Sequence, residues 1–200
     1  MYKYLKRILD IIFSIMLLPI LLIIVLVFGI AIKVTDGGPI FYVAERRGRN
    51  GKIFKMYKIR TMKVNSPDIR NSDNSTFNSK NDPRVTSVGK FLRKTSLDEF
   101  AQIINVFKGD MSFIGPRPVT IDKSLKEYDE KRKKRLIVRP GITGYTQAYF
   151  RNSILQEKKF EYDAYYAQSY NFLLDIKIVI KTVKTILFQE NIYGMSEENE

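Results

Sequence analysis

Two adjacent carboxylates, Asp98 and Glu99 in the stretch TSLDEF, are the first candidates for chemistry in this 200-residue chain. The sequence has no His and no Cys, which removes the usual general base, thiolate nucleophiles and most structural zinc sites. Acid–base or nucleophilic work must therefore fall to Asp, Glu, Lys, Tyr, Ser or Thr. A carboxylate can attack phosphorus to form an acyl phosphate, and a hard ion such as Mg²⁺ is the metal expected to assist it.

The same residues also fit a purely structural role. Ser96 followed by Glu99 three positions later matches the capping-box pattern of a helix start, with Ser96 as the N-cap. Acidic residues in a first turn are stabilised by the helix dipole, by about 0.3–1 kcal/mol. A helix N-terminus also attracts anions, so a phosphate could bind beside such a carboxylate. These six residues alone leave both interpretations open.

The charge balance predicts a polyanionic partner. The chain has 34 Lys and Arg against 21 Asp and Glu, a formal net charge of +13, which suits phosphorylated substrates, an anionic membrane surface or nucleic acid. Three arginines, Arg84, Arg117 and Arg139, stand in loops stiffened by Pro or Gly, where a guanidinium fork can be aimed at phosphate. There is no P-loop, no GxGxxG motif and no Asp-x-Asp pair, which counts against a conventional kinase or sugar-adding glycosyltransferase.

The N-terminus predicts a membrane element. Residues 11–32, IIFSIMLLPILLIIVLVFGIAI, carry no charge, and a straight helix of that length covers about 33 Å, enough to cross the hydrocarbon core. Pro19 should kink or break this helix. Basic residues flank the run on both sides: Lys3, Lys6 and Arg7 before it, and Lys33, Arg46, Arg47, Arg49 and Lys52 after it. Because positive charge favours the cytoplasmic side, we expect a re-entrant helix broken at Pro19, with a kinked spanning helix as the alternative.

The remaining sequence predicts an α+β fold that is mostly helical, with a few short strands and interfacial amphipathic helices. Short strands are expected within 34–63, on either side of a basic, Gly-rich turn. The polar segment 64–84 should be a long loop, either a lid over a site or unstructured chain. Two helices joined at 94–96 are expected within 87–107, and further helices at 123–136, 157–169 and 171–188. The segments 109–120 and 138–152, punctuated by Gly and Pro, are expected to be loops. The last has apolar and basic stripes that suit either a membrane surface or ordinary packing.

The order of several motifs carries a resemblance to a known family. The stretches FYVAERRGRNGKIFKMYKIRTM, DPRVTSVGKFLRKTSLDEFAQIINVFKGDMSFIGPRP, RPGITGYTQ and KFEYDAYYAQSYNFLLDIKIVIKTV follow one another with compact spacing. Together they resemble the bacterial sugar transferases known as small monotopic phosphoglycosyl transferases, over nearly the whole chain. The series LDE, NxxKGDMSxxGPRP and RPGITG is long and specific.

The resemblance implies a function. Members of the family move a phosphosugar from a UDP-sugar to a polyprenol (undecaprenyl) phosphate in the cytoplasmic leaflet of the bacterial inner membrane, releasing UMP, as a membrane step of glycoconjugate assembly. The family is monotopic, and its reaction passes through a covalent phospho-Asp. Carried over by motif, Asp98 is the nucleophile, Glu99 assists it, both lie at the Mg²⁺ site, and Arg117 binds phosphate. Weaker candidates for the diphosphate and nucleotide are Lys58, Arg60, Arg84, Arg139 and Arg151.

The resemblance also implies an organisation of the chain: a re-entrant membrane helix at 1–33, a catalytic domain on the cytosolic face at 34–188 and a tail at 189–200. The sequence departs from the family pattern where Leu18 stands before Pro19 in place of a serine, and where TGYTQAYFR replaces TGWAQVNGR. The first change leaves the expected bend to rest more on Pro19 alone, and the second bears on sugar or nucleotide preference more than on the reaction. A non-enzymatic, basic membrane-surface adaptor is the alternative; nucleic-acid binding is disfavoured by the apolar run, and a homo-oligomer stays open.

Overall fold

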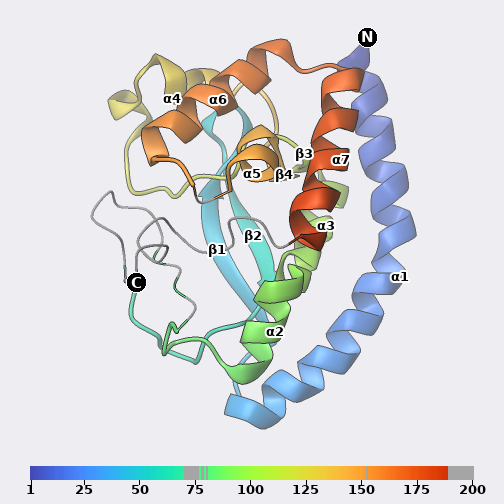
Figure 1. Cartoon of the computed structure of the whole chain (residues 1–200), viewed down its shortest axis with the longest axis vertical. Helices are drawn as coiled ribbons and strands as arrows, with labels where there is room; N and C mark the ends of the chain where they lie inside the picture. The colour runs from blue at the N-terminus through green and yellow to red at the C-terminus, as the bar shows by residue number, and fades with distance from the viewer. Residues whose placement is uncertain (70–76, 78, 80, 152, 189–200) are drawn as a thin grey trace.

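The computed structural model describes residues 1–69, 77, 79, 81–151 and 153–188. A β-hairpin lies at its centre, with α1, α2, α3 and α7 on one side and α4 and α6 on the other (Figure 1). Helices dominate, as expected. Their bounds are α1 Tyr2–Asp36, α2 Ser87–Thr95, α3 Ile103–Lys108, α4 Glu130–Arg135, α5 Tyr145–Tyr149, α6 Gln156–Ser169 and α7 Phe172–Leu187. The 3₁₀ turns are η1 Arg49–Gly51, η2 Leu97–Gln102 and η3 Leu125–Glu127, and the strands are β1 Phe41–Arg47, β2 Ile53–Ile59, β3 Ser112–Ile114 and β4 Gly141–Thr143.

The N-terminal helix α1 is a single helix that continues through Pro19. The expectation that Pro19 breaks the helix is therefore wrong. The ribbon instead curves around the rest of the molecule (Figure 1). Proline removes only one backbone donor from the helix. Leu18 and Leu21, on either side of Pro19, pack into the same core cluster, and these contacts hold the helix together across it.

One face of α1 is covered by the folded domain along most of its length. Its buried residues run from Asp10 to Ile32, and Leu21, Ile24 and Ile32 share a core cluster with Ile59 of the hairpin. The opposite face is apolar and exposed. Among the described residues, α1 is the one helix long and apolar enough to cross a membrane by length and composition, and 17% of its most apolar window is buried.

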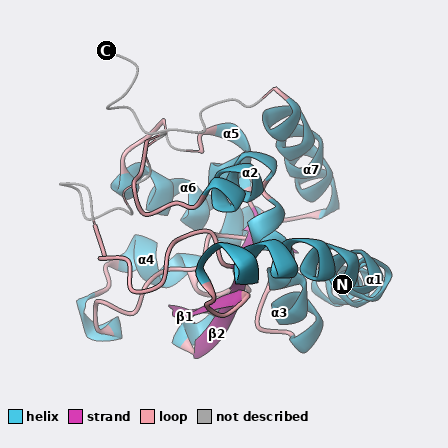
Figure 2. Ribbon diagram, turned by 90° about the horizontal axis from the view of Figure 1, so that it is seen from below, coloured by secondary structure: helices cyan, strands magenta, loops and turns pink. Residues whose placement is uncertain are grey.

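Both ends of α1 are tied to the same domain. Near the N-terminal end, Lys6 forms an ion pair with Asp175 of α7, and that carboxylate also accepts a 2.6 Å hydrogen bond from the Tyr166 hydroxyl of α6. At the other end, Asp36 pairs with Arg60, which follows β2. Figure 2 shows α1 and α7 together on one side of the molecule, away from α4 and α6.

The central hairpin agrees with the sequence expectation. Strands β1 and β2 are antiparallel, with Phe41 opposite Ile59, and the basic turn between them uses positive φ angles at Asn50 (55°) and Gly51 (77°). The side chain of Asn105 on α3 binds the edge of β2: it accepts from the Tyr57 amide at 3.0 Å and donates to the Lys55 carbonyl at 2.7 Å. Asn105 is fully buried, so this bond pair fixes α3 and the preceding η2 against β2.

The expected joint between two helices lies at Ser96, and Gly109 ends the second helix with φ 90°. The capping box at Ser96 is wrong. Ser96 takes a left-handed conformation with φ 58°, and its side chain makes no cap hydrogen bond. The reason is that Ser96 also ends α2, where its amide bonds to the Arg93 carbonyl, and the turn that follows is 3₁₀. Residues 98 and 99 therefore stand on a tight turn against β2.

Three further segments differ from expectation. Residues 112–114 and 141–143, expected as loops, form the parallel pair β3 and β4. Residues 145–149, also expected in a loop, form the short helix α5. The charged segment 123–136 is helical only in η3 and α4, because Asp129 starts a new helix by accepting from the Arg132 amide. Helices α6 and α7 agree closely with the expected ranges, and the tail 189–200 lies outside the described residues.

Candidate active site

A broad cleft of about 2180 Å³ opens beside the hairpin and contains both carboxylates of the TSLDEF stretch. Charged residues from different elements line it, including Lys58 of β2, Asp98 and Glu99 of η2, and Arg117 after β3. Apolar residues of the two longest helices line the same cleft, Leu17 from α1 and Ile186 from α7. The cleft thus joins a charged region to an apolar one.

Glu99 is held by cations. Lys58 Nζ donates to Glu99 Oε1 at 2.8 Å, and Arg117 Nη1 lies 3.6 Å from the same oxygen. Burial acts to raise the pKa of Glu99, but the charges of Lys58, Arg117 and Arg151 outweigh it and lower this pKa to about 2. Glu99 is therefore a permanent anion at neutral pH, and it fixes the two cations at the cleft wall.

Asp98 stands in a different environment. Its carboxylate makes no hydrogen bond to any described residue, and the ammonium group of Lys58 lies 3.8 Å from Oδ2. Burial raises the pKa of Asp98; Lys58 and Arg93 oppose that rise and Glu99 adds to it. Two adjacent carboxylates thus have pKa values pushed in opposite directions, which is a recurring feature of catalytic pairs. Asp98 is the member with oxygens available to a ligand.

The loop that carries Arg117 is fixed from below by a buried ion pair. Arg135 of α4 pairs with Asp163 of α6 and donates to the Arg117 carbonyl at 2.7 Å, and the Thr146 hydroxyl donates to Asp163 at 2.8 Å. At Gly115 the backbones approach so closely that an added Cβ would lie 2.4 Å from the Arg139 carbonyl. These contacts hold the backbone of the loop in place, so the Arg117 side chain extends toward the cleft from a fixed position.

The other sequence candidates fall into two groups. Arg151 lines the cleft and contributes to the field at Glu99. Arg60 and Arg84 also line it, but each is engaged by a carboxylate, Asp36 and Asp82 respectively. Arg84 further donates to the Pro67 carbonyl at 3.0 Å.

Arg139 lies elsewhere. It lines a separate, smaller cavity and donates to the Gly109 carbonyl at 2.8 Å. The structure thus brings Lys58, Arg117 and Arg151 together with the carboxylates and places Arg139 apart from them.

The aromatic residues that depart from the family pattern, Tyr145, Tyr149 and Phe150, form a cluster with Tyr162. Phe150 stacks on Tyr162 of α6 with ring centroids 4.6 Å apart, and Tyr145 lies 5.8 Å from Tyr162 and 4.8 Å from Tyr149. These rings pack on one another outside the residues that line the cleft, although Arg151, which follows Phe150, does line it. These three aromatic substitutions therefore act on the support of the site, whereas Thr146, which also departs from the pattern, lines the cleft and donates to Asp163.

Sequence reasoning missed several residues at the site. Arg93 lies near enough to Asp98 to oppose the rise in its pKa, and it donates to the Thr61 hydroxyl at 3.0 Å. Arg135 lies in a charged run, KEYDEKRKKRL, and no local pattern in this run distinguishes a buried arginine from exposed ones. Pairing with Asp163, which is 28 positions away, could be found only from the fold.

The residues suit a divalent cation that arrives with a diphosphate. No group of three or more acidic residues gathers as a metal cage in the part of the chain that the structure describes. Mg²⁺ commonly binds through one or two carboxylates together with substrate phosphates, keeping water ligands. The unbonded carboxylate of Asp98 meets that requirement, whereas Glu99 Oε1 is already bound to Lys58.

The fold and the site define a protein with a long, apolar, largely exposed N-terminal helix and a carboxylate-centred, cation-lined cleft suited to phosphate chemistry. The model of the family described as Bacterial sugar transferase matches residues 1–189, and the chain belongs to that family.

Curated relatives agree. The chain is 40% identical over 203 residues to the undecaprenyl-phosphate galactose phosphotransferase of Salmonella typhimurium, covering 96% of this chain and 42% of that protein. It is 41% identical to the uncharacterized sugar transferase EpsL of Bacillus subtilis, covering 94% and 90%. It is 36% identical to the UDP-N-acetylgalactosamine-undecaprenyl-phosphate N-acetylgalactosaminephosphotransferase of Aeromonas hydrophila, covering 93% and 44%. The chain thus spans less than half the length of the Salmonella and Aeromonas relatives.

Proposed function

We propose that this protein is a phosphoglycosyl transferase that moves a sugar phosphate from a UDP-sugar to polyprenol (undecaprenyl) phosphate and releases UMP. The relatives from Salmonella and Aeromonas are named for transfer of galactose phosphate and N-acetylgalactosamine phosphate to undecaprenyl phosphate. The observation that carries the proposal is the pair at the cleft wall. Asp98 has unbonded carboxylate oxygens, and its neighbour Glu99 is locked by Lys58 and Arg117.

The proposed reaction has two displacements at one phosphorus. An Asp98 oxygen attacks the β-phosphorus of the UDP-sugar, the bond from that phosphorus to the bridging oxygen breaks, and UMP leaves with the electron pair. A phosphate oxygen of the polyprenol phosphate then attacks the same phosphorus, and the Asp98 carboxylate leaves. The products are UMP and a polyprenol diphosphate sugar, and Asp98 is regenerated.

Attack of an anion on an anion needs local positive charge. Lys58, Arg117 and Arg151 supply it next to Asp98 without neutralising the carboxylate by a direct hydrogen bond. Arginine can also bind phosphate oxygens through two parallel N–H groups, which holds the donor in line for attack. Bound Mg²⁺, held by Asp98 with Glu99 nearby, would supply further charge neutralisation on the diphosphate.

The arrangement of α1 supports a monotopic protein at the cytoplasmic face of the bacterial inner membrane. Its two ends are paired to one domain through Lys6–Asp175 and Asp36–Arg60, and its middle is covered by that domain. A helix held in this way cannot place its ends on opposite sides of a bilayer without drawing the polar domain into the hydrocarbon. Leu17 of α1 lines the cleft, so a lipid acceptor held beside this helix would have access to Asp98 from the membrane side.

An assay with purified full chain tests the function. The protein, Mg²⁺ and undecaprenyl phosphate are incubated with UDP-galactose, UDP-N-acetylgalactosamine and other UDP-sugars, and UMP is measured. We expect UMP release with at least one donor, and no release when EDTA is added. Without the acceptor, UMP release should stop after one turnover. A protein that binds membranes but releases no UMP with any donor would be an adaptor and would contradict the proposal.

A further inference from the structure

A second, smaller cavity lies at the N-terminal end of α1, and it shares no lining residue with the catalytic cleft. Its volume is about 160 Å³. Five cationic residues line it against a single carboxylate, that of Asp10. The cations are Lys3, Lys6 and Arg7 from α1, Arg49 from the hairpin turn, and Arg139 before β4.

Some of these cations have structural tasks. Arg7 donates to the Val106 and Phe107 carbonyls at 2.7 and 2.9 Å, and Arg139 donates to the Gly109 carbonyl, so both cap the C-terminal end of α3. Lys6 is paired with Asp175. Helix capping and this pair account for three of the five positive charges.

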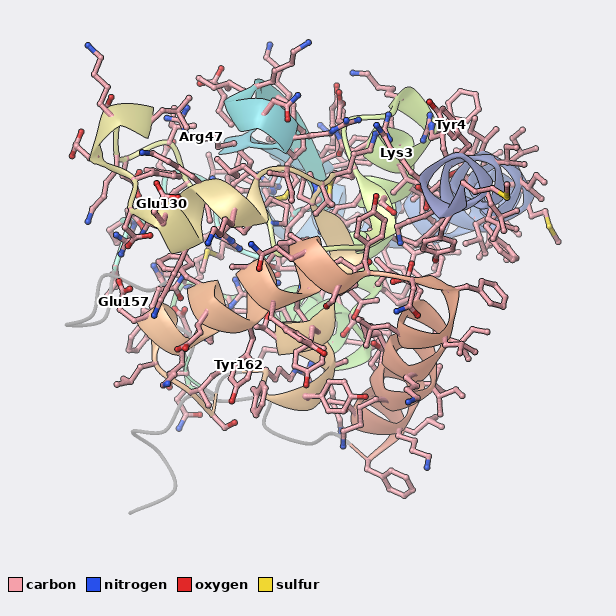
Figure 3. The ribbon with its side chains drawn as sticks, turned by 90° about the horizontal axis from the view of Figure 1, so that it is seen from above. Lys3, Tyr4, Arg47, Glu130, Glu157 and Tyr162 are labelled. Atoms are coloured by element: carbon pink, nitrogen blue, oxygen red, sulfur yellow. The ribbon has the colours of Figure 1, made fainter. Side chains whose placement is uncertain are left out.

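Two cations are left without a task. Arg49 Nε is buried and has no hydrogen-bond partner among the described residues, which is a costly condition for a charged donor. Lys3 is exposed and forms no ion pair or hydrogen bond with the described residues. Figure 3, viewed from the N-terminal end, labels Lys3 on the side of α1 that faces the rest of the domain, with Tyr4 beside it.

The carboxylate in the cavity does not balance these charges. Asp10 Oδ1 already accepts from the Ser112 hydroxyl and the Phe113 amide, both at 3.1 Å. The cations also repel one another. Burial is the main cause that lowers the pKa of Arg139, and the neighbouring charges of Arg7 and Arg49 lower this pKa further. A bound anion would satisfy Arg49 and relieve this repulsion.

We propose that this cavity binds the phosphate group of an anionic phospholipid. Its position favours a lipid source, because exposed apolar side chains that can contact acyl chains surround this end of α1. Leu5 and Ile8 adjoin Lys6 and Arg7 in sequence, and Phe172 of α7 lies against Tyr2 with ring centroids 6.3 Å apart. Free phosphate has the same headgroup chemistry and is the other source. A phosphate group bound in this cavity would contact α1, the hairpin turn and the residue before β4 at once, and would link these three elements outside the catalytic cleft.

The test is native mass spectrometry of the full chain in a neutral detergent, titrated separately with phosphatidylglycerol, phosphatidylcholine and inorganic phosphate. We expect one tightly bound phosphatidylglycerol, with binding weakened about tenfold or more in the double variant Lys3→Gln, Arg49→Gln. The control variant Lys126→Gln, Lys134→Gln removes the same charge from exposed lysines outside both cavities and should bind as the unmodified protein does. The single change Lys3→Gln is on an exposed side chain, so it reports on the site even if the Arg49 change disturbs the fold.

The outcomes separate cleanly. Saturable binding of phosphatidylglycerol that is lost in the site variants supports the lipid source. Saturable competition by inorganic phosphate that is lost in the same variants supports the site with free phosphate as its ligand. Equal binding by site and control variants, or equal binding of phosphatidylcholine in all proteins, overturns the proposal. Because binding is measured without turnover, the result does not depend on the proposed transferase activity.

Discussion

Lys58 Nζ lies 2.8 Å from Glu99 Oε1 and reaches Asp98 less closely, at 3.8 Å. One ammonium group thus fixes one carboxylate and leaves the other unbonded. This asymmetry separates two residues that are neighbours in the chain into an anchoring group and a group available to a ligand.

The first prediction concerns Lys58→Met. Loss of this charge removes the strongest opposition to burial at both carboxylates, so the pKa of Glu99 should rise from about 2 and that of Asp98 should rise further. We expect UMP release to fall roughly 10²-fold, and the acid limb of the pH–rate profile to move to higher pH. Lys55→Met, on the same strand but outside the cleft, should leave both unchanged. An unshifted pH profile in Lys58→Met would contradict the assigned role.

The second prediction compares the stability of two variants. Burial raises the pKa of Asp98, so its charged form costs stability at pH 7, and Asp98→Asn should raise the melting temperature by a few degrees. The pKa of Glu99 is lowered to about 2 from 4.5, so Glu99 stabilises the fold above pH 4.5 and this stabilisation is lost as the pH falls toward 2. Glu99→Gln should therefore lower the melting temperature at pH 7. Thermal unfolding in detergent checks both, and shifts in the same direction would show that the pair is not asymmetric.

The third prediction concerns the buried pair beneath the Arg117 loop. Arg135→Met leaves Asp163 buried without its charge partner, which should cost about 3–5 kcal/mol of stability. It also removes the bond to the Arg117 carbonyl, so the KM for the UDP-sugar should rise in protein that remains folded. Lys133→Met on the same helix, outside the cleft, removes only an exposed pair with Glu130 (Figure 3), and should cost about 0–1 kcal/mol. Equal effects of the two changes on stability and KM would exclude the positioning role.

The fourth prediction concerns topology. The chain has no Cys, so the single variants Tyr4→Cys and Thr35→Cys place unique labels near the two ends of α1, both at exposed positions. A re-entrant α1 predicts that a membrane-impermeant maleimide labels both from the cytoplasmic face in inverted vesicles and neither from the outside of intact cells. Labelling from opposite faces would instead establish a spanning helix.

Much of this fold could be predicted from local sequence. The hairpin was indicated by alternating runs around RGRNG, and the two helices around Ser96 by apolar spacing. The order of the sequence motifs also pointed to Asp98 and Glu99 as the candidate catalytic residues. Two incorrect predictions, the capping box at Ser96 and the helix break at Pro19, depended on contacts with other parts of the chain. Ser96 could not cap a helix because it ends another, and Pro19 did not interrupt α1 because the domain packs on both sides of it.

The partners of the arginines could not be predicted in the same way. Arg60, Arg84, Arg117 and Arg139 all follow or precede loop signals, yet two of them bind carboxylates, one faces Glu99 and one caps α3. Guanidinium groups look alike in a sequence, and only long-range packing decides which of them points into the cleft. For the same reason the Arg135–Asp163 pair was invisible before the fold was known.

The most direct test of the central claim is the mass of the protein after incubation with a UDP-sugar and Mg²⁺ but without lipid acceptor. If Asp98 is the nucleophile, intact-mass and peptide analysis should show one added sugar phosphate on the peptide that contains Asp98. Adding undecaprenyl phosphate should discharge it, and Asp98→Asn should show none while losing at least about 10³-fold in turnover. A sugar phosphate that persists in Asp98→Asn, or turnover in that variant close to that of the unmodified protein, would contradict the account.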